Sequence, residues 1–209
     1  MNKGILIVIS GFAGVGKGTL VKRLVQNYDN YALSVSMTTR GPRNGETNGK
    51  EYFFVTKEEF EDKIASDGFV EHACYCGNYY GTPKSYVEEQ MELGKDVILE
   101  IEIQGALQIK KKFPGAVLVY ILPPSAAELE KRLRGRGSET EEKIRERLNR
   151  AAEESKGLEN YDYLIVNDDI DEAEKRLRGV LVAAHNTPVQ NTELISKIRE
   201  EVKGFSKGE

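Results

Sequence analysis

One stretch near the amino terminus restricts the fold more than any other. Residues 5–9 are all Ile, Leu or Val, and Gly-Phe-Ala-Gly-Val-Gly-Lys-Gly-Thr follows at 11–19. The apolar run predicts a strand buried on both faces of a parallel sheet. The glycines and Lys17, placed between that strand and a helical pattern, predict a loop that holds phosphate at a helix N-terminus. A glycine turn that only packs strand against helix is the alternative, and the position of Lys17 favours phosphate binding.

The loop departs from the common phosphate-binding pattern at one position. The residue after the lysine is usually Ser or Thr and binds magnesium, but here it is Gly18, and the hydroxyl comes one residue later at Thr19. Direct magnesium binding at the usual position is therefore not expected, which leaves Thr19 as the candidate hydroxyl.

The composition limits the partners and the location. The 209 residues are enough for one α/β core with a small insert, and the net charge of -4 provides no global basic field for nucleic acid or an anionic membrane. The chain opens directly into its first strand, and no apolar run is long enough to cross a bilayer. We expect a cytoplasmic protein whose anion sites are local.

Hydrophobic periodicity and capping signals divide the chain into alternating elements. Strands are expected over residues 31–39, 52–55, 69–75, 96–102, 116–122 and 163–166. Helices are expected over residues 19–26, 56–67, 82–94, 103–112, 125–133, 141–157, 170–184 and 192–202. Within this series Thr56 and Ser125 begin capping boxes, and Thr82 is interpreted as the cap of the helix that follows it.

Residues 34–85 form a small mixed-β insert in this scheme. Its loop at 41–50 is rich in turn formers, yet the segment also holds Arg40, Arg43 and Lys50, which suits a second anionic substrate. Core character resumes at residue 96, and that strand ends in Glu100 and Glu102. Ligands collect at the carboxyl ends of parallel strands, so these carboxylates should lie beside the phosphate loop.

Two further groups of side chains invite functional interpretations. Arg136 lies between glycines in a short basic segment, and Arg147 lies on the helix behind it; we interpret both as functional, and Arg145 and Arg150 as a solvated face paired with glutamates. A second group comprises His72, Cys74 and Cys76, which alternate on one strand. Because His185 is the only other His or Cys, a zinc site would need carboxylates, and we interpret these three as small, half-buried strand residues.

The order of these parts is the layout of a phosphoryl-transfer enzyme with two anionic substrates. One phosphate chain would bind at Lys17, a second phosphate at Arg40 and Arg43, and the segment with Arg136 would close over both. Such transfer depends on positioning, magnesium, positive charge and exclusion of water.

The motifs together resemble the guanylate kinase family over residues 4–184. They are the phosphate loop 11–19, Ser-Val-Ser-Met-Thr-Thr-Arg-Gly-Pro-Arg at 34–43, Asn-Gly-Lys-Glu-Tyr-Phe-Phe at 48–54, Gly-Asn-Tyr-Tyr-Gly-Thr at 77–82, Leu-Glu-Ile-Glu-Ile-Gln-Gly at 99–105, Arg-Gly-Arg-Gly at 134–137 and Val-Asn-Asp-Asp at 166–169. The resemblance implies an α/β fold: a three-layer parallel-sheet core at 1–33 and 95–184, a GMP-binding insert at about 34–85, a lid at about 134–147 and a separate tail at 185–209.

The resemblance also implies transfer of a phosphoryl group from ATP, with Mg²⁺, to GMP or dGMP. It assigns catalysis to Lys17, Arg40, Arg136 and Arg147. It assigns ATP binding to Gly11, Phe12, Ala13, Gly14, Val15, Gly16, Lys17, Gly18, Thr19 and Asn167. It assigns GMP binding to Ser36, Arg40, Arg43, Tyr52, Glu71, Tyr80, Thr82, Glu100 and Glu102.

Glu71 has the clearest chemical reason among these residues. Guanine presents adjacent N1–H and N2–H donors, which one carboxylate accepts together, whereas adenine presents a lone pair at that ring nitrogen. Glu71 also alternates away from His72, Cys74 and Cys76 along its strand, so it can face a pocket while they face elsewhere.

Some positions depart from the family pattern, and some alternatives stay open. Glu100 and Glu102 stand where many members have aspartates, which leaves open how guanine reading and magnesium organisation are divided between them. Phe12 and Ala13 replace a Pro-Ser pair, so one hydroxyl contact is missing. A non-catalytic guanylate-kinase-like binding domain and a kinase for another nucleoside monophosphate are the alternative functions, and the chain can be a monomer or a homo-oligomer.

Overall fold

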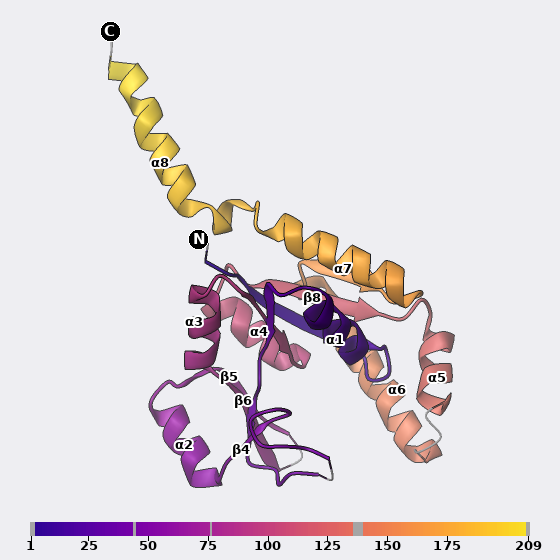
Figure 1. Ribbon diagram of the computed structural model, residues 1–209. Coiled ribbons are helices and arrows are strands. Elements are labelled where there is room, and N and C mark those ends of the chain that lie inside the picture. The colour runs from indigo at the N-terminus through magenta and orange to yellow at the C-terminus, as the bar shows by residue number, and fades with distance from the viewer. Residues whose placement is uncertain (1–2, 44, 76, 136–139, 208–209) are drawn as a thin grey trace.

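The computed structural model describes residues 3–43, 45–75, 77–135 and 140–207. A five-stranded parallel sheet forms its centre (Figure 1). In spatial order the strands are β2 (Tyr31–Leu33), β7 (Asp96–Glu100), β1 (Leu6–Gly11), β8 (Val117–Leu122) and β9 (Tyr163–Val166). All six residues of β1 are buried, which explains why its sequence has no polar alternation before the loop.

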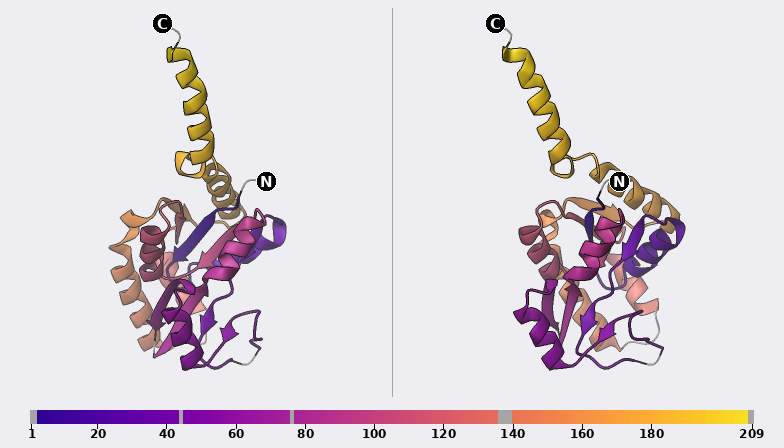
Figure 2. Two further views of the ribbon diagram at one scale, coloured as in Figure 1. Left: turned by 90° about the vertical axis from the view of Figure 1, so that its left-hand side faces the viewer. Right: turned by 60° about the vertical axis from the view of Figure 1, so that its left-hand side comes forward.

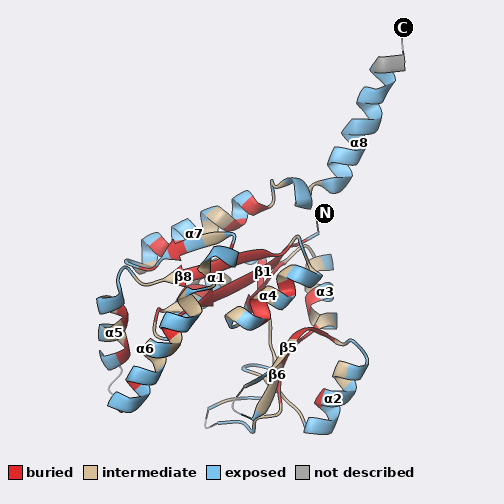
Figure 3. Cartoon of the chain, turned by 180° about the vertical axis from the view of Figure 1, so that it is seen from behind, coloured by how far each residue is buried: buried red, intermediate tan, exposed pale blue. Residues whose placement is uncertain are grey.

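Helices cover both faces of this sheet and give three layers. One face packs against α1 (Lys17–Asn27) and α7 (Ile170–Ala184). The other packs against α3 (Lys84–Glu92), α4 (Ile103–Lys112), α5 (Ala126–Gly135) and α6 (Glu141–Ser155). The buried residues of the central strands divide between two apolar clusters, one on each face of the sheet (Figure 3). The expected α/β fold with a parallel-sheet core is confirmed.

A second, mixed sheet lies below the core in Figure 1. In spatial order it contains β4 (Phe53–Phe54), β3 (Met37–Thr38), β6 (Asn78–Pro83) and β5 (Phe69–Tyr75), and α2 (Lys57–Ala65) accompanies it. The Thr56 capping box is present at the start of α2, and the Ser125 hydroxyl accepts from the Glu128 N–H before α5. The small mixed-β insert is therefore present between β2 and β7.

Three expected boundaries are wrong. The strand expected over 31–39 is two strands, because the chain leaves the core sheet after Leu33 and β3 joins the second sheet; an alternating pattern continues through such a switch. Thr82 does not cap a helix but lies in β6, and α3 begins after Pro83. β7 ends at Glu100, and Glu102 is the residue that precedes α4.

The carboxyl-terminal helix α8 (Thr192–Lys203) projects from the body on the side away from the second sheet (Figures 1 and 2). At its base, Asn191 donates to the carbonyls of His185 and Thr187, and the Gln190 amide donates to the Gly115 carbonyl. Over the residues described, none of the helices is long and apolar enough to cross a membrane.

Candidate nucleotide-binding cleft

The phosphate loop leaves β1 and turns directly into α1. Gly14 and Gly16 have φ of 85° and 87°, a region that side-chain-bearing residues avoid, so glycine is required at both turns. No side chain caps the N-terminus of α1, which leaves its first N–H groups available to an anion. The Lys17 ammonium lies 3.5 Å from the Gly11 carbonyl oxygen, above the same turn.

Two side chains behind the loop hold its backbone. The buried Asn167 amide, at the end of β9, donates to the Val15 carbonyl at 2.8 Å. Arg132 of α5 donates to the Val15 carbonyl at 3.3 Å and to the Asn167 carbonyl at 3.0 Å. A Cβ on Gly16 would lie 2.6 Å from the Asn167 amide nitrogen, so that glycine also permits the close approach. Asn167, which was expected to lie near adenine, therefore donates a hydrogen bond to the phosphate loop.

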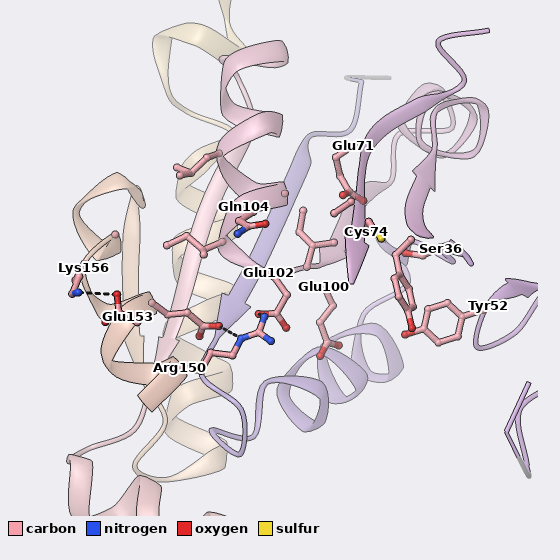
Figure 4. A pocket seen from close by; sticks show the side chains of 18 residues that line it. Ser36, Tyr52, Glu71, Cys74, Glu100, Glu102, Gln104, Arg150, Glu153 and Lys156 are labelled. Carbon is pink, nitrogen blue, oxygen red and sulfur yellow. Dashed lines mark hydrogen bonds and ion pairs between the residues drawn. The ribbon is translucent and has the colours of Figure 1, made fainter. Parts of the chain in front are cut away.

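A cleft of about 820 Å³ separates the second sheet from α4 and α6. Figure 4 shows Ser36, Tyr52 and Glu71 on one side of it, Arg150 on the other, and Glu100 and Glu102 between them. Six residues expected at a GMP site therefore line one cavity: Ser36, Tyr52, Glu71, Tyr80, Glu100 and Glu102.

Glu71 is the most buried acid in this cleft, with 5% of its surface exposed. Burial raises the pKa of its carboxyl, and hydrogen bonds from Thr82 partly oppose that rise. The Thr82 hydroxyl donates to Glu71 Oε1 at 2.8 Å. Glu71 Oε2 lies 3.1 Å from where a Cβ of Gly105 would be, so the first turn of α4 approaches the carboxylate closely.

The arginine loop of the second sheet is held by an acid that sequence reasoning missed. Arg40 forms a two-point ion pair with Glu46, with hydrogen bonds of 2.9 and 2.8 Å, and lies 5.4 Å from the Tyr52 ring centre. The Glu46 carboxylate also accepts from the Arg43 N–H at 2.7 Å. These bonds lower the pKa of Glu46, so it stays ionised and pairs with Arg40 in the absence of a phosphate.

The two carboxylates after β7 have different surroundings. Glu100 lies beside the phosphate loop, with its oxygens 3.5 and 3.7 Å from where a Cβ of Gly18 would be, as expected. Glu102 accepts from Arg150 of α6 at 3.3 Å. Arg150 also donates to Glu154 at 2.9 Å, and its side chain is 40% exposed, which agrees with a solvated arginine paired with glutamates; it lines the cleft as well. The i+4 spacing to Glu154 was visible in the sequence, but the contact with Glu102 spans 48 residues.

Three comparisons with known proteins point to the same family. The profile of the guanylate kinase family matches residues 3–184. The chain belongs to the guanylate kinase family. A guanylate kinase from Caldanaerobacter subterraneus subsp. tengcongensis is 48% identical over 96% of this chain and 97% of its own. One from Clostridium perfringens is 51% identical over 87% and 84%. The crystal structure of the guanylate kinase from Anaplasma phagocytophilum has a TM-score of 0.72 and 34% identity, covering 90% of each chain.

Some of the predicted residues fall outside the part of the chain that the structure describes, and one strand residue faces differently from the prediction. Arg136 falls outside the described residues, and Arg147 lies half-buried on α6. Cys74, expected to face away from Glu71, is exposed and is among the residues that line the cleft. Cys76 also falls outside the described residues. Among the residues that the structure describes, no three His, Cys, Asp or Glu side chains are grouped so that they could hold a metal ion.

Proposed function

We propose that this chain transfers the γ-phosphoryl group of ATP to GMP, giving ADP and GDP, and that it does so in the cytoplasm. A phosphate oxygen of GMP attacks the γ-phosphorus while the bond to the β-phosphate oxygen breaks. The observation that carries the proposal is the buried Glu71 carboxylate in the cleft between the second sheet and helices α4 and α6. The lining of that cleft also includes Glu100, which lies beside the phosphate loop, and Tyr52, which lies beside Arg40. Membership of the guanylate kinase family supports the proposal independently.

The guanine end of the cleft would be read by Glu71. Its carboxylate would accept from N1–H and N2–H of guanine, and the Thr82 hydroxyl holds it through Oε1. Ser36 and the two acids after β7 line the same cavity and would complete the set. A base without those two donors would leave a buried acid unpaired, which makes such sites selective.

The phosphate of GMP would bind at the arginine loop. Arg40 is held between Glu46 and the Tyr52 ring and faces the Tyr80 hydroxyl, so it is oriented before substrate arrives. A phosphate would compete with Glu46 for the guanidinium, since both present two oxygens to its planar donors. Arg43, Tyr52 and Tyr80 would complete this subsite, and dGMP, which has the same base and phosphate, would bind as GMP does.

ATP would bind with its phosphates on the phosphate loop. Lys17 would supply charge to the transferred group, and the uncapped N-terminus of α1 would supply N–H donors. Guanylate kinases use a divalent metal with ATP, and we propose Mg²⁺. The Thr19 hydroxyl and the Glu100 carboxylate beside Gly18 are oxygen donors of the kind that this ion prefers. Closure of residues 134–147 would bring Arg136 and Arg147 to the phosphates.

The test is ADP formation from ATP and Mg²⁺ with GMP, dGMP, AMP, CMP or UMP supplied in turn. We expect turnover with GMP and dGMP and rates lower by orders of magnitude with the other three. Comparable rates with AMP would contradict the assignment of guanine to Glu71. Absence of turnover with all five, together with measurable GMP binding, would support a non-catalytic binding domain instead.

A further inference from the structure

A chain of ion pairs joins helix α6 to the wall of the cleft. The Arg150 guanidinium donates from Nε to Glu154 Oε1 at 2.9 Å and from Nη2 to Glu102 Oε2 at 3.3 Å. Figure 4 shows Arg150 beside Glu102 at the cavity. Arg150 and Glu154 lie one turn apart on α6, whereas Glu102 directly precedes α4. We call these three residues the α6 bridge.

The two ends of the α6 bridge differ in how firmly they are held. The Glu154 side chain is 11% exposed, and the Glu102 side chain is 58% exposed. Glu154 also accepts from the Tyr120 hydroxyl at 3.4 Å. Tyr120 is buried, and its ring packs edge-on against the ring of Phe12 in the phosphate loop. The Glu154 end is therefore fixed to the core, and Glu102 is the end that reaches into the cleft.

Arg150 lies between two carboxylates that would otherwise repel each other. Burial raises the pKa of Glu154, the nearby Glu102 charge also raises it, and the hydrogen bond from Arg150 opposes the rise. Without the guanidinium, the exposed Glu102 carboxylate would turn toward water, because water solvates it better than a cavity wall beside a second acid does. The α6 bridge thus removes a repulsion and favours one orientation of Glu102.

The α6 bridge adds little to the stability of the fold. Both Arg150 and Glu102 are more than one-third exposed, and ion pairs with such access to water contribute little to the free energy of unfolding. The contact nevertheless joins residues that are 48 positions apart in the sequence, and it lies at the cavity that would hold GMP. Its effect should therefore appear in substrate binding rather than in folding.

Guanine offers a donor to the carboxylate that Arg150 holds. The exocyclic amine at N2 carries two hydrogens, and Glu71 would accept one of them together with N1–H. The second N2–H needs another acceptor, and Glu102 lines the same cavity. An acceptor that is already oriented loses less conformational entropy when substrate binds than a mobile one does.

We propose that Arg150 is a positioning residue for GMP, which holds the Glu102 carboxylate in place by joining it to Glu154. The inference rests on the proposed GMP kinase function. In this arrangement Arg150 acts on the substrate through Glu102. Loss of Arg150 and loss of the Glu102 carboxylate should therefore weaken GMP binding by the same route and leave ATP binding unchanged.

Steady-state kinetics of a double-mutant cycle tests the proposal. The variants are Arg150→Gln, Glu102→Gln and the two combined, and the control is Arg145→Gln, which changes an exposed arginine of the same helix. We expect KM for GMP to rise about threefold to tenfold in each single variant, with KM for ATP and Tm nearly unchanged. Adding Arg150→Gln to Glu102→Gln should change KM for GMP by less than about twofold, and Arg145→Gln should match wild type.

Each other outcome overturns the proposal. An unchanged KM for GMP in either single variant would show that the α6 bridge does not orient a group that binds GMP. Full additivity in the double variant would show that Arg150 acts independently of Glu102. Equal rises in KM for GMP and ATP with a lowered Tm would indicate a structural role, and a rise in Arg145→Gln would indicate a general effect of charge on α6. A wild type without GMP turnover would instead overturn the proposed function, and this inference with it.

Discussion

The Glu71 carboxylate has a proposed role that its buried surroundings oppose. Glu71 is buried beside the first turn of α4 with one hydroxyl donor, Thr82, on its side chain. The ionised form is the one that guanine's donors would bind, yet burial raises the pKa of the carboxyl and so disfavours that form. Without substrate, the folded protein therefore contains an acid whose ionised form its burial disfavours.

The raised pKa of Glu71 predicts that the substitution Glu71→Gln stabilises the ligand-free protein as pH rises. The pKa of Glu71 is higher in the folded than in the unfolded state, so its ionisation lowers the free energy of unfolding as pH rises through the folded-state pKa. Glu71→Gln removes that ionisation and keeps an oxygen for Thr82. In thermal unfolding without ligand, the Tm of Glu71→Gln relative to wild type should increase from pH 5 to pH 8. The exposed Glu88→Gln change should show no such trend, and a constant Tm difference for Glu71→Gln would contradict the prediction.

The Lys17 side chain, unlike that of Glu71, has little effect on the stability of the ligand-free protein. Its one hydrogen bond to the loop is long, at 3.5 Å. Lys17→Ala should therefore leave the Tm nearly unchanged while it lowers kcat by roughly a hundredfold to a thousandfold, the usual effect of removing one group that stabilises transition-state charge. Steady-state kinetics with GMP and circular dichroism measure the two effects, and near-normal turnover would remove Lys17 from catalysis.

At the scale of elements, the phosphate loop depends on segments far from it in sequence. Arg132 of α5 and Asn167 after β9 both donate to the Val15 carbonyl, so the ends of two distant elements fix the loop's shape. Glu128 accepts from Arg132 at 3.0 Å and orients it. The loop is thus rigid on the side away from the cleft.

Removal of this support should affect the ATP side selectively. Arg132→Met should raise KM for ATP by about tenfold and KM for GMP much less, since a hydrogen bond from a charged donor contributes about 1.5–3 kcal/mol. Lys131→Met is the matched control, because Lys131 is exposed and pairs only loosely with Glu128, at 3.6 Å. Equal increases in both KM values for Arg132→Met would show a general loss of structure instead.

Local chemistry was readable from the sequence and distant contacts were not. The glycine turns of the phosphate loop, the capping box at Thr56 and the Ser125 hydroxyl bond depend on neighbours within a few residues, and each formed as expected. Thr82 has the sequence of a cap but bonds to Glu71, a partner on the adjacent strand. Arg132, Arg150 and Glu46 acquire their roles through folded contacts or loop geometry that periodicity does not encode.

At the scale of the whole molecule, the function depends on two sheets that meet at a cleft. The parallel sheet presents the phosphate loop and Glu100 at the carboxyl ends of its strands, and the mixed sheet presents Glu71, Tyr52 and Tyr80 across the cavity. Continuous apolar runs predicted strands of the parallel sheet, and turn formers between short strands predicted the mixed-β insert. These patterns did not show that residues 31–39 pass from one sheet to the other, because the change of sheet after Leu33 depends on contacts with strands that are distant in the sequence.

The central claim is that Glu71 selects guanine across this cleft. The most direct measurement is the ratio of kcat/KM for GMP to that for AMP, in wild type and in Glu71→Gln at equal, saturating ATP. We expect the ratio to fall on the order of a hundredfold in the variant, with KM for ATP nearly unchanged, because the paired acceptors for N1–H and N2–H are lost. A ratio that stays at the wild-type value, or an equal rise in KM for both GMP and ATP, would contradict the claim.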